Sequence, residues 1–179
     1  EWGCAILMEV ETGDIKAIAN LHRGKDNLYY DSKNHAIVSE IAPGSTFKLA
    51  SFLSLLEDGY KKLSDTVDTK NGKIEFYKTT KTDTKIGGYG KSTFGDAFVV
   101  SSNVEISKEI FNNYNSKEGK KKFYSNLQKF QLTEPLKLQL PYSSNHKLDP
   151  PNFEKTLKNG DIKTVKWSGI TLPSMSIGY

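Results

Sequence analysis

The stretch from 45 to 58 constrains the fold most, because its helical pattern is apolar on most sides. Pro43 and Gly44 precede this stretch and Gly59 follows it, so both ends carry helix-boundary signals. Its large apolar side chains are Phe47, Leu49, Phe52, Leu53, Leu55 and Leu56. A helix of this kind is stable only when neighbouring elements cover it. We therefore expect a globular fold in which helix 45–58 is largely buried in a mainly helical region.

Composition agrees with a soluble globular domain. The chain has 179 residues, of which 36% are hydrophobic and 26% are charged. No window reaches the roughly 18 consecutive apolar residues that a membrane-spanning helix needs. The net charge of +4 is too small to indicate a nucleic-acid partner. Cys4 is the only cysteine and the three histidines lie far apart, so the sequence predicts neither an internal disulfide nor a metal site.

The remaining patterns predict an α+β fold with an antiparallel sheet. Apolar runs at 4–10 and 15–20 flank a turn that contains Gly13, which predicts a β-hairpin. The pair Asn71-Gly72 predicts a second hairpin over 64–78. Further helices are expected at 93–100, 104–114 and 117–131. Loops are expected at 22–35 and 79–92, and residues 132–168 are expected to be irregular.

One candidate for chemistry is a Ser-x-x-Lys pair. Chance alone places about two such pairs in a chain of this composition, and two occur, at Ser45 with Lys48 and at Ser144 with Lys147. The first pair opens a helix, so both side chains share one face. Burial in an apolar helix would lower the pKa of Lys48 and let it activate a serine hydroxyl. The plainer interpretation is a helix cap and a surface lysine.

Other motifs are weaker. Ser-x-Asn occurs three times, beginning at Ser32, Ser101 and Ser143, and the pattern alone does not choose among them. The glycines at 87, 88 and 90 lack the Gly-Lys-Ser/Thr ending of a phosphate-binding loop. Four lysines between 117 and 122 are best interpreted as a solvated helix face.

Four longer segments of the sequence indicate its family. Residues 41–48, Ile-Ala-Pro-Gly-Ser-Thr-Phe-Lys, resemble the active-site segment of the transpeptidase domain of class B penicillin-binding proteins. Residues 5–19 resemble its first hairpin, and 101–104, Ser-Ser-Asn-Val, resemble its second motif. Residues 174–179 resemble the segment before its later helices. The four matches occur in the family's order across nearly the whole chain.

The resemblance implies a penicillin-binding-protein/serine β-lactamase-like fold and a role for each matched residue. Ser45 would be the nucleophile, Lys48 the base that activates it, and Ser101 the group that passes a proton to the leaving amine. Asn103 would hold Lys48 and the substrate amide. The reaction would join D-Ala-D-Ala stem peptides of peptidoglycan through a serine acyl-enzyme, which β-lactam antibiotics would also form. No metal or organic cofactor is implied.

The family's third motif, Lys-Thr-Gly or Lys-Ser-Gly, does not occur in these residues. We therefore expect residues 1–179 to be the N-terminal portion of a single transpeptidase domain, incomplete at its C-terminus. The complete protein would then be the enzyme. It would work at the periplasmic face of the bacterial inner membrane, anchored by a segment outside this chain. Its partners would be other cell-wall synthesis or divisome proteins, with septation favoured over elongation.

Two alternatives stay open. A serine β-lactamase or a β-lactam-sensing domain shares Ser-x-x-Lys and a similar fold, although the residues around Ser45 and the opening hairpin favour the transpeptidase. A non-catalytic scaffold of cell-wall synthesis would keep the fold without a working site. The complete set of Ser45, Lys48, Ser101 and Asn103 argues against that scaffold.

Overall fold

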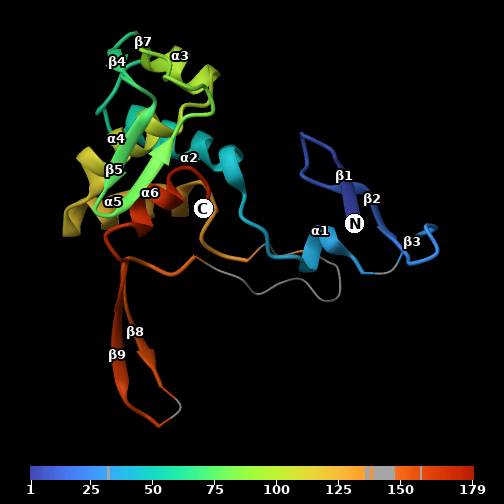
Figure 1. Cartoon of the computed structure of the whole chain (residues 1–179). Helices are drawn as coiled ribbons and strands as arrows, with labels where there is room; N and C mark the ends of the chain where they lie inside the picture. The colour runs from blue at the N-terminus through green and yellow to red at the C-terminus, as the bar shows by residue number, and fades with distance from the viewer. Residues whose placement is uncertain (32, 136–137, 139–147, 158) are drawn as a thin grey trace. The chain divides into compact units, whose positions relative to one another are not determined.

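A computed structural model describes residues 1–31, 33–135, 138, 148–157 and 159–179. Contacts within the chain divide it into two compact units. The first comprises residues 1–41 and 135–146, and the second comprises residues 42–134 and 147–179. Every paired strand in both units is antiparallel, and helices accompany the strands, which confirms the predicted α+β class (Figure 1).

The first unit is a three-stranded sheet with the order β1-β2-β3. Its strands are β1 (Trp2–Met8), β2 (Ile15–Arg23) and β3 (Tyr29–Tyr30). The predicted hairpin is therefore confirmed, with Ala5 opposite Ala19 in its register. Gly13 adopts a φ of 76° in the turn, a conformation that glycine reaches without steric cost.

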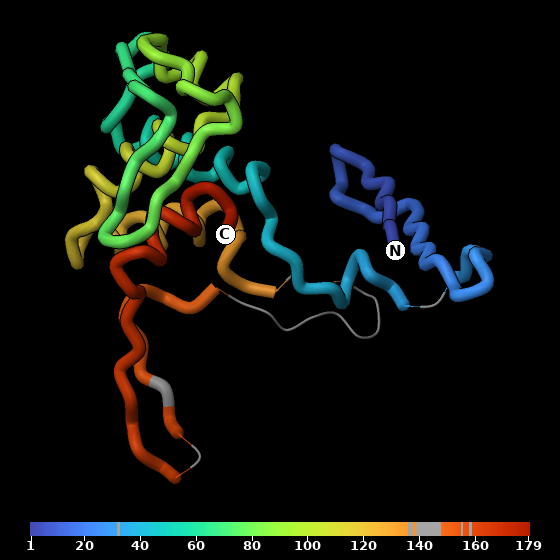
Figure 2. The backbone as a smooth tube through the Cα atoms, viewed as in Figure 1, coloured from blue at the N-terminus to red at the C-terminus, as the bar shows by residue number. Residues whose placement is uncertain are grey.

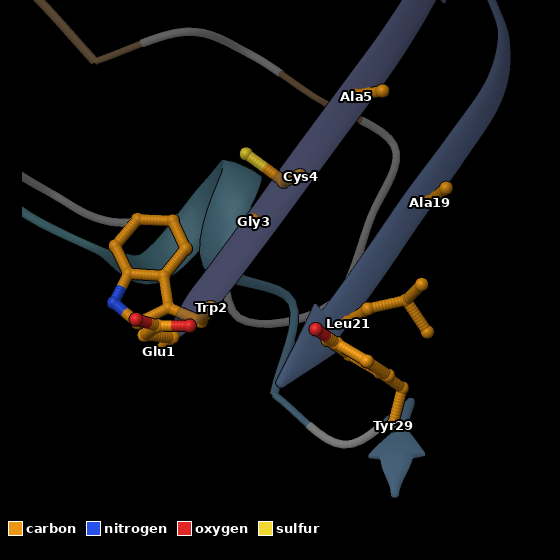
Figure 3. Close-up of a pocket in the computed structure, with 8 residues that line it drawn as sticks. All are labelled: Glu1, Trp2, Gly3, Cys4, Ala5, Ala19, Leu21 and Tyr29. Carbon is orange, nitrogen blue, oxygen red and sulfur yellow. The ribbon is translucent and has the colours of Figure 1, made fainter. Parts of the chain in front are cut away.

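A short helix, α1 (His35–Val38), follows the sheet within the same unit. The side chain of Asn20 links the two, because it donates to the Asn34 side chain (3.0 Å) and accepts from the Ala36 amide (3.1 Å). The Trp2 ring stacks on the His35 ring at 4.2 Å. An apolar hollow lined by residues of β1, β2 and β3 lies on this sheet and contains none of the candidate site residues (Figure 3).

The second unit is mainly helical. Its helices are η1 (Gly44–Phe47, a 3-10 turn), α2 (Lys48–Glu57), α3 (Phe94–Val99), α4 (Asn103–Tyr114), α5 (Lys117–Lys129) and α6 (Thr171–Met175). The core contains Phe52 and Leu55 from α2, packed with Ile106 and Ile110 from α4 and Phe123 from α5. The predicted helices at 93–100, 104–114 and 117–131 are thereby confirmed to within two residues at each end.

Helix 45–58 differs from its prediction only at its start. Its first turn is the 3-10 turn η1, and the α-helix begins at Lys48. The expectation of a largely buried helix is confirmed, because six of the ten α2 residues are buried, Leu55 completely, although Leu49 is 52% exposed. Gly44, the first residue of this turn, adopts a φ of 59°, a conformation that glycine reaches without steric cost.

The prediction of a hairpin over 64–78 is wrong. β4 (Thr66–Asp68) pairs with β7 (Lys91–Thr93), and β5 (Lys73–Phe76) pairs with β6 (Thr79–Thr82). Asn71-Gly72 does form a turn, but the strands on either side of it pair elsewhere, partly with the predicted loop at 79–92. The β5–β6 hairpin contacts α4 (Figures 1 and 2).

The prediction that residues 132–168 are irregular is also wrong in part. β8 (Asn152–Thr156) and β9 (Ile162–Lys166) form an antiparallel hairpin (Figure 2). Phe153 lies opposite Val165 in this hairpin, and Asn159-Gly160 between the strands is a recognised turn pair that the sequence interpretation did not use. Gly160 adopts a φ of 87° there.

Among the described residues, none of the helices is both long and apolar enough to cross a lipid bilayer.

Candidate active site

Ser45 lies on the 3-10 turn η1, immediately before α2. The carbonyl of Ser45 accepts a hydrogen bond from the Lys48 amide, and its side chain is exposed. The segment after α6 supports this turn, because the Gly44 amide donates to the Gly178 carbonyl (3.1 Å). A Cβ at Gly178 would lie 1.9 Å from the Gly44 carbonyl oxygen, so only glycine permits this approach. The turn that presents Ser45 therefore depends on the close packing of two backbones.

Lys48 is the most unusual group near Ser45, because its side chain is only 1% exposed. The Lys48 Nζ donates to the Ser101 carbonyl oxygen (2.6 Å) and lies 2.9 Å from Ser101 Oγ. Burial lowers the pKa of Lys48 to about 8, and the negative charge of Asp83 partly opposes that change. A lysine in this condition is partly neutral near physiological pH, so it is able to accept a proton.

Ser101 lies on the tight turn between α3 and α4 and adopts a φ of 56°, in the left-handed region. Its amide donates to the Phe98 carbonyl (2.9 Å). The next residue, Ser102, caps α4 by accepting from the Glu105 amide (3.0 Å). The strained residue is thus held between a helix end and a helix start, and its side chain and carbonyl both reach Lys48.

Asn103 begins α4 and differs from the expectation that it holds Lys48. Its side-chain amide donates to the Thr82 carbonyl at the end of β6 (2.7 Å). Asn103 belongs to the second motif, two residues after Ser101, but its side chain bonds the end of the strand rather than the lysine.

Sequence reasoning missed Asp83, which follows β6. Its Oδ1 accepts from the Ser102 hydroxyl (2.9 Å) and from the Val104 amide (3.0 Å). The side chain is 9% exposed. No periodic signal could have identified Asp83, because the sequence of residues 79–92 predicts a loop. Its role depends on a hydrogen bond with Ser102, which lies 19 residues later in the chain.

The structure thus brings Lys48 and Ser101 together, with Ser45 three residues before the lysine and Asn103 two residues after the serine. No hydrogen bond to Ser45 Oγ is present among the described residues. The competing pair, Ser144 and Lys147, lies outside the described residues. Within the described part of the chain, histidine, cysteine and carboxylate side chains form no cluster of three or more that could hold a metal ion.

Comparisons with known proteins bear on the family and the fold of the chain. Residues 3–166 match the family model of the penicillin binding protein transpeptidase domain. The peptidoglycan D,D-transpeptidase FtsI of Buchnera aphidicola subsp. Schizaphis graminum is 31% identical over 127 residues. That alignment covers 64% of this chain but only 22% of the relative, so the chain spans about a fifth of its length.

Solved structures show the same fold. A peptidoglycan glycosyltransferase from Burkholderia ambifaria has a TM-score of 0.75 at 22% identity, and the match covers all of this chain and 48% of that one. Penicillin binding protein 3 from Mycobacterium tuberculosis, complexed with ampicillin, has a TM-score of 0.71 at 23% identity. That match covers 99% of this chain and 36% of the other.

The family model covers most of the chain, and the two segments that carry Ser45 and Ser101 meet within the region that it matches. The chain therefore belongs to the penicillin-binding protein transpeptidase domain family, as a class B member.

Proposed function

We propose that the complete protein cross-links peptidoglycan by acyl transfer, with Ser45 as its nucleophile. The contact between the buried Lys48 and Ser101 carries this proposal. Lys48, whose pKa is lowered, lies one helical turn after Ser45, so the contact brings both motifs to one place. The name of the Buchnera relative, a peptidoglycan D,D-transpeptidase, supports the substrate class.

In the proposed reaction, neutral Lys48 takes the proton from Ser45 Oγ as this oxygen attacks the carbonyl of the penultimate D-Ala. Ser101 passes a proton from the Lys48 ammonium to the departing amine, and terminal D-Ala leaves. An amine from a neighbouring stem peptide then attacks the ester, and Ser45 regains its proton when the cross-link forms.

Asn103 is proposed to hold the substrate amide. Its own amide group is bonded to the Thr82 carbonyl, which fixes the side chain and leaves its oxygen as the group available to a substrate N–H. β-Lactams would acylate Ser45 because they resemble D-Ala-D-Ala. The ampicillin complex of the Mycobacterium protein supports β-lactam binding in a protein of this fold.

The sequence similarity to FtsI also supports a proposal about where in the cell the protein works. We expect the complete protein to work at the periplasmic face of the inner membrane, anchored by a segment outside this chain. Its partners would be divisome or other cell-wall synthesis proteins.

A transpeptidation assay tests the proposal. The complete protein is given a pentapeptide-bearing substrate, and released D-Ala and cross-linked product are quantified. Ser45→Ala should abolish both, while Ser144→Ala, which alters the other Ser-x-x-Lys pair, should leave both at the wild-type level. Equal loss in both variants would contradict the assignment. Rapid hydrolysis of penicillin without cross-linking would instead indicate a β-lactamase.

A further inference from the structure

Asp83 is buried behind the turn that carries the second motif. One carboxylate oxygen, Oδ1, accepts two hydrogen bonds, from the Ser102 hydroxyl and the Val104 amide. The other oxygen, Oδ2, is buried and has no hydrogen-bond partner among the described residues. A buried carboxylate is costly to a fold unless its charge is compensated. The residues around Asp83 should therefore show what compensates the cost of burying its carboxylate.

The two donors to Asp83 flank Asn103 on either side. Ser102 is also the cap of α4, so the carboxylate, the cap and the first turn of the helix form one hydrogen-bonded unit. Bonds to an ionised acceptor are about twice as strong as bonds between neutral groups. Strand β6 supplies the neighbouring Thr82 carbonyl to the side chain of Asn103. Two successive residues of one strand end thus fix the position of the second motif.

The charge of Asp83 also acts on Lys48. Burial disfavours the Lys48 ammonium, and the carboxylate opposes that effect. Several other charged side chains of the same unit are engaged elsewhere: Lys81 with Ser174, Lys61 with Glu109, Lys108 with Glu105, and Lys122 with Asp58. Asp83 is a carboxylate whose charge favours the Lys48 ammonium.

We propose that Asp83 is a positioning residue for the reaction, and this proposal rests on the proposed function. It holds the Ser101 turn through Ser102 and Val104, and that turn holds Lys48 through the Ser101 carbonyl and hydroxyl, so Asp83 acts on the lysine through these contacts as well as through its charge. The two effects are separable by substitution. Asparagine keeps an oxygen acceptor and removes the charge, whereas leucine removes both at similar volume.

A titration of Lys48 tests the electrostatic effect without any substrate. The complete protein is labelled with ¹³Cε-lysine, and the Lys48 signal is assigned by its loss in Lys48→Met. In Asp83→Asn the pKa of Lys48 should fall by about 0.5 unit or more. Asp26→Asn is the matched control, because Asp26 also accepts one hydroxyl and one backbone amide, from Tyr30 and Leu28. It should leave the signal unchanged. An unchanged Lys48 pKa in Asp83→Asn overturns the proposal.

Acylation rates test the positioning effect. In Asp83→Asn the acid limb of the pH–rate profile for penicillin acylation should move to lower pH, with a plateau within about threefold of wild type. In Asp83→Leu the plateau itself should fall about tenfold or more, because two buried donors lose their acceptor. Ser102→Ala, which removes one donor, replaces the leucine variant if that variant fails to fold, and should lower the plateau by a smaller factor.

Equal plateaus in the leucine and asparagine variants would overturn the positioning role, and so would a Ser102→Ala plateau at the wild-type level where that variant is used. Failure of the proposed function has a different signature. A wild-type protein that takes up no penicillin would count against Ser45 as nucleophile, while the Lys48 titration would still decide for or against Asp83.

Discussion

Lys48 Nζ bonds both the carbonyl oxygen (2.6 Å) and the hydroxyl (2.9 Å) of Ser101, a residue 53 positions later in the chain. One partner is the backbone of a left-handed turn and the other is a side chain that can relay a proton. The Ser101 carbonyl thus fixes the position of the Lys48 ammonium, and the Ser101 hydroxyl offers it a path for proton transfer. This pairing accounts for a buried cation that would otherwise only destabilise the fold.

The pH dependence of acylation should follow Lys48. Because the pKa of Lys48 is lowered to about 8, the rate of penicillin acylation should rise with pH through that value and then level off. Lys48→Ala should lower the rate by about 10²–10⁴-fold and remove the rise. Stopped-flow acylation between pH 6 and about 10 measures both effects. Lys62→Ala, at an exposed lysine, should retain the wild-type profile; a preserved rise in Lys48→Ala would assign the base elsewhere.

Gly178 should be sensitive to the smallest substitution. A Cβ there would collide with the Gly44 carbonyl at 1.9 Å and displace the turn that presents Ser45. Gly178→Ala should therefore slow acylation by about tenfold or more, since displacements of about 1 Å cost large factors in rate. Gly59→Ala is the control, because Gly59 has a similar φ of 70° but open space around its Cα. Equal rates in the two variants would show that the contact with Gly44 is unimportant.

Glu105 should make the folded protein less stable as pH rises. Burial raises the pKa of this carboxyl to about 7, although its bond with Lys108 opposes the change. Between its ordinary value of 4.5 and about 7, the folded state binds more protons than the unfolded state. Stability therefore falls with rising pH across this window and is level above it.

Glu105→Gln should remove that fall and gain up to about 3 kcal/mol of unfolding free energy above pH 7. Thermal unfolding of the complete protein at several pH values measures the effect. The matched variant Glu118→Gln alters an exposed glutamate paired with Lys121 and should show no such gain. If the unfolding free energy of Glu105→Gln changes with pH in the same way as that of the wild type, the account is contradicted.

The sequence predicted the elements whose signals are local. The hairpin around Gly13 and the helices capped by Thr93, Ser102 and Ser116 occur where the patterns indicated, because turn and cap residues act within four positions. The spacing of Ser45 and Lys48 on one helical turn is a local signal of the same kind, and their roles stay a prediction. The contact between Lys48 and Ser101 was expected only from resemblance, since nothing local specifies it.

Strand pairing and the support behind the site could not be predicted in the same way. Asn71-Gly72 has the residues of a hairpin turn, yet its flanking strands pair with 79–82 and 91–93. Short polar strands such as β6 carry no alternation strong enough to mark them. The contacts of Asp83 with Ser102 and Val104 depend on where that strand ends. The role of Asp83 could therefore be recognised only from the tertiary structure.

The 179-residue chain by itself should label poorly with fluorescent penicillin, compared with the complete protein at equal exposure. These residues contain no Lys-Thr-Gly or Lys-Ser-Gly motif, and the resemblance to the family implies that this motif contributes one donor of the oxyanion site. Loss of one such donor typically costs about 10²–10³ in rate. Gel fluorescence of both proteins after the same exposure measures the difference. Strong labelling of the isolated chain would mean that these residues supply a working oxyanion site themselves.

Ser45 as the acylated nucleophile is the central claim, and mapping the penicillin adduct tests it most directly. The complete protein is treated with benzylpenicillin, digested and analysed by tandem mass spectrometry. The account predicts that the penicilloyl group is found on Ser45 alone, and that Ser45→Ala carries none while Ser144→Ala carries as much as wild type. An adduct on another residue, or an undiminished adduct in Ser45→Ala, would contradict it.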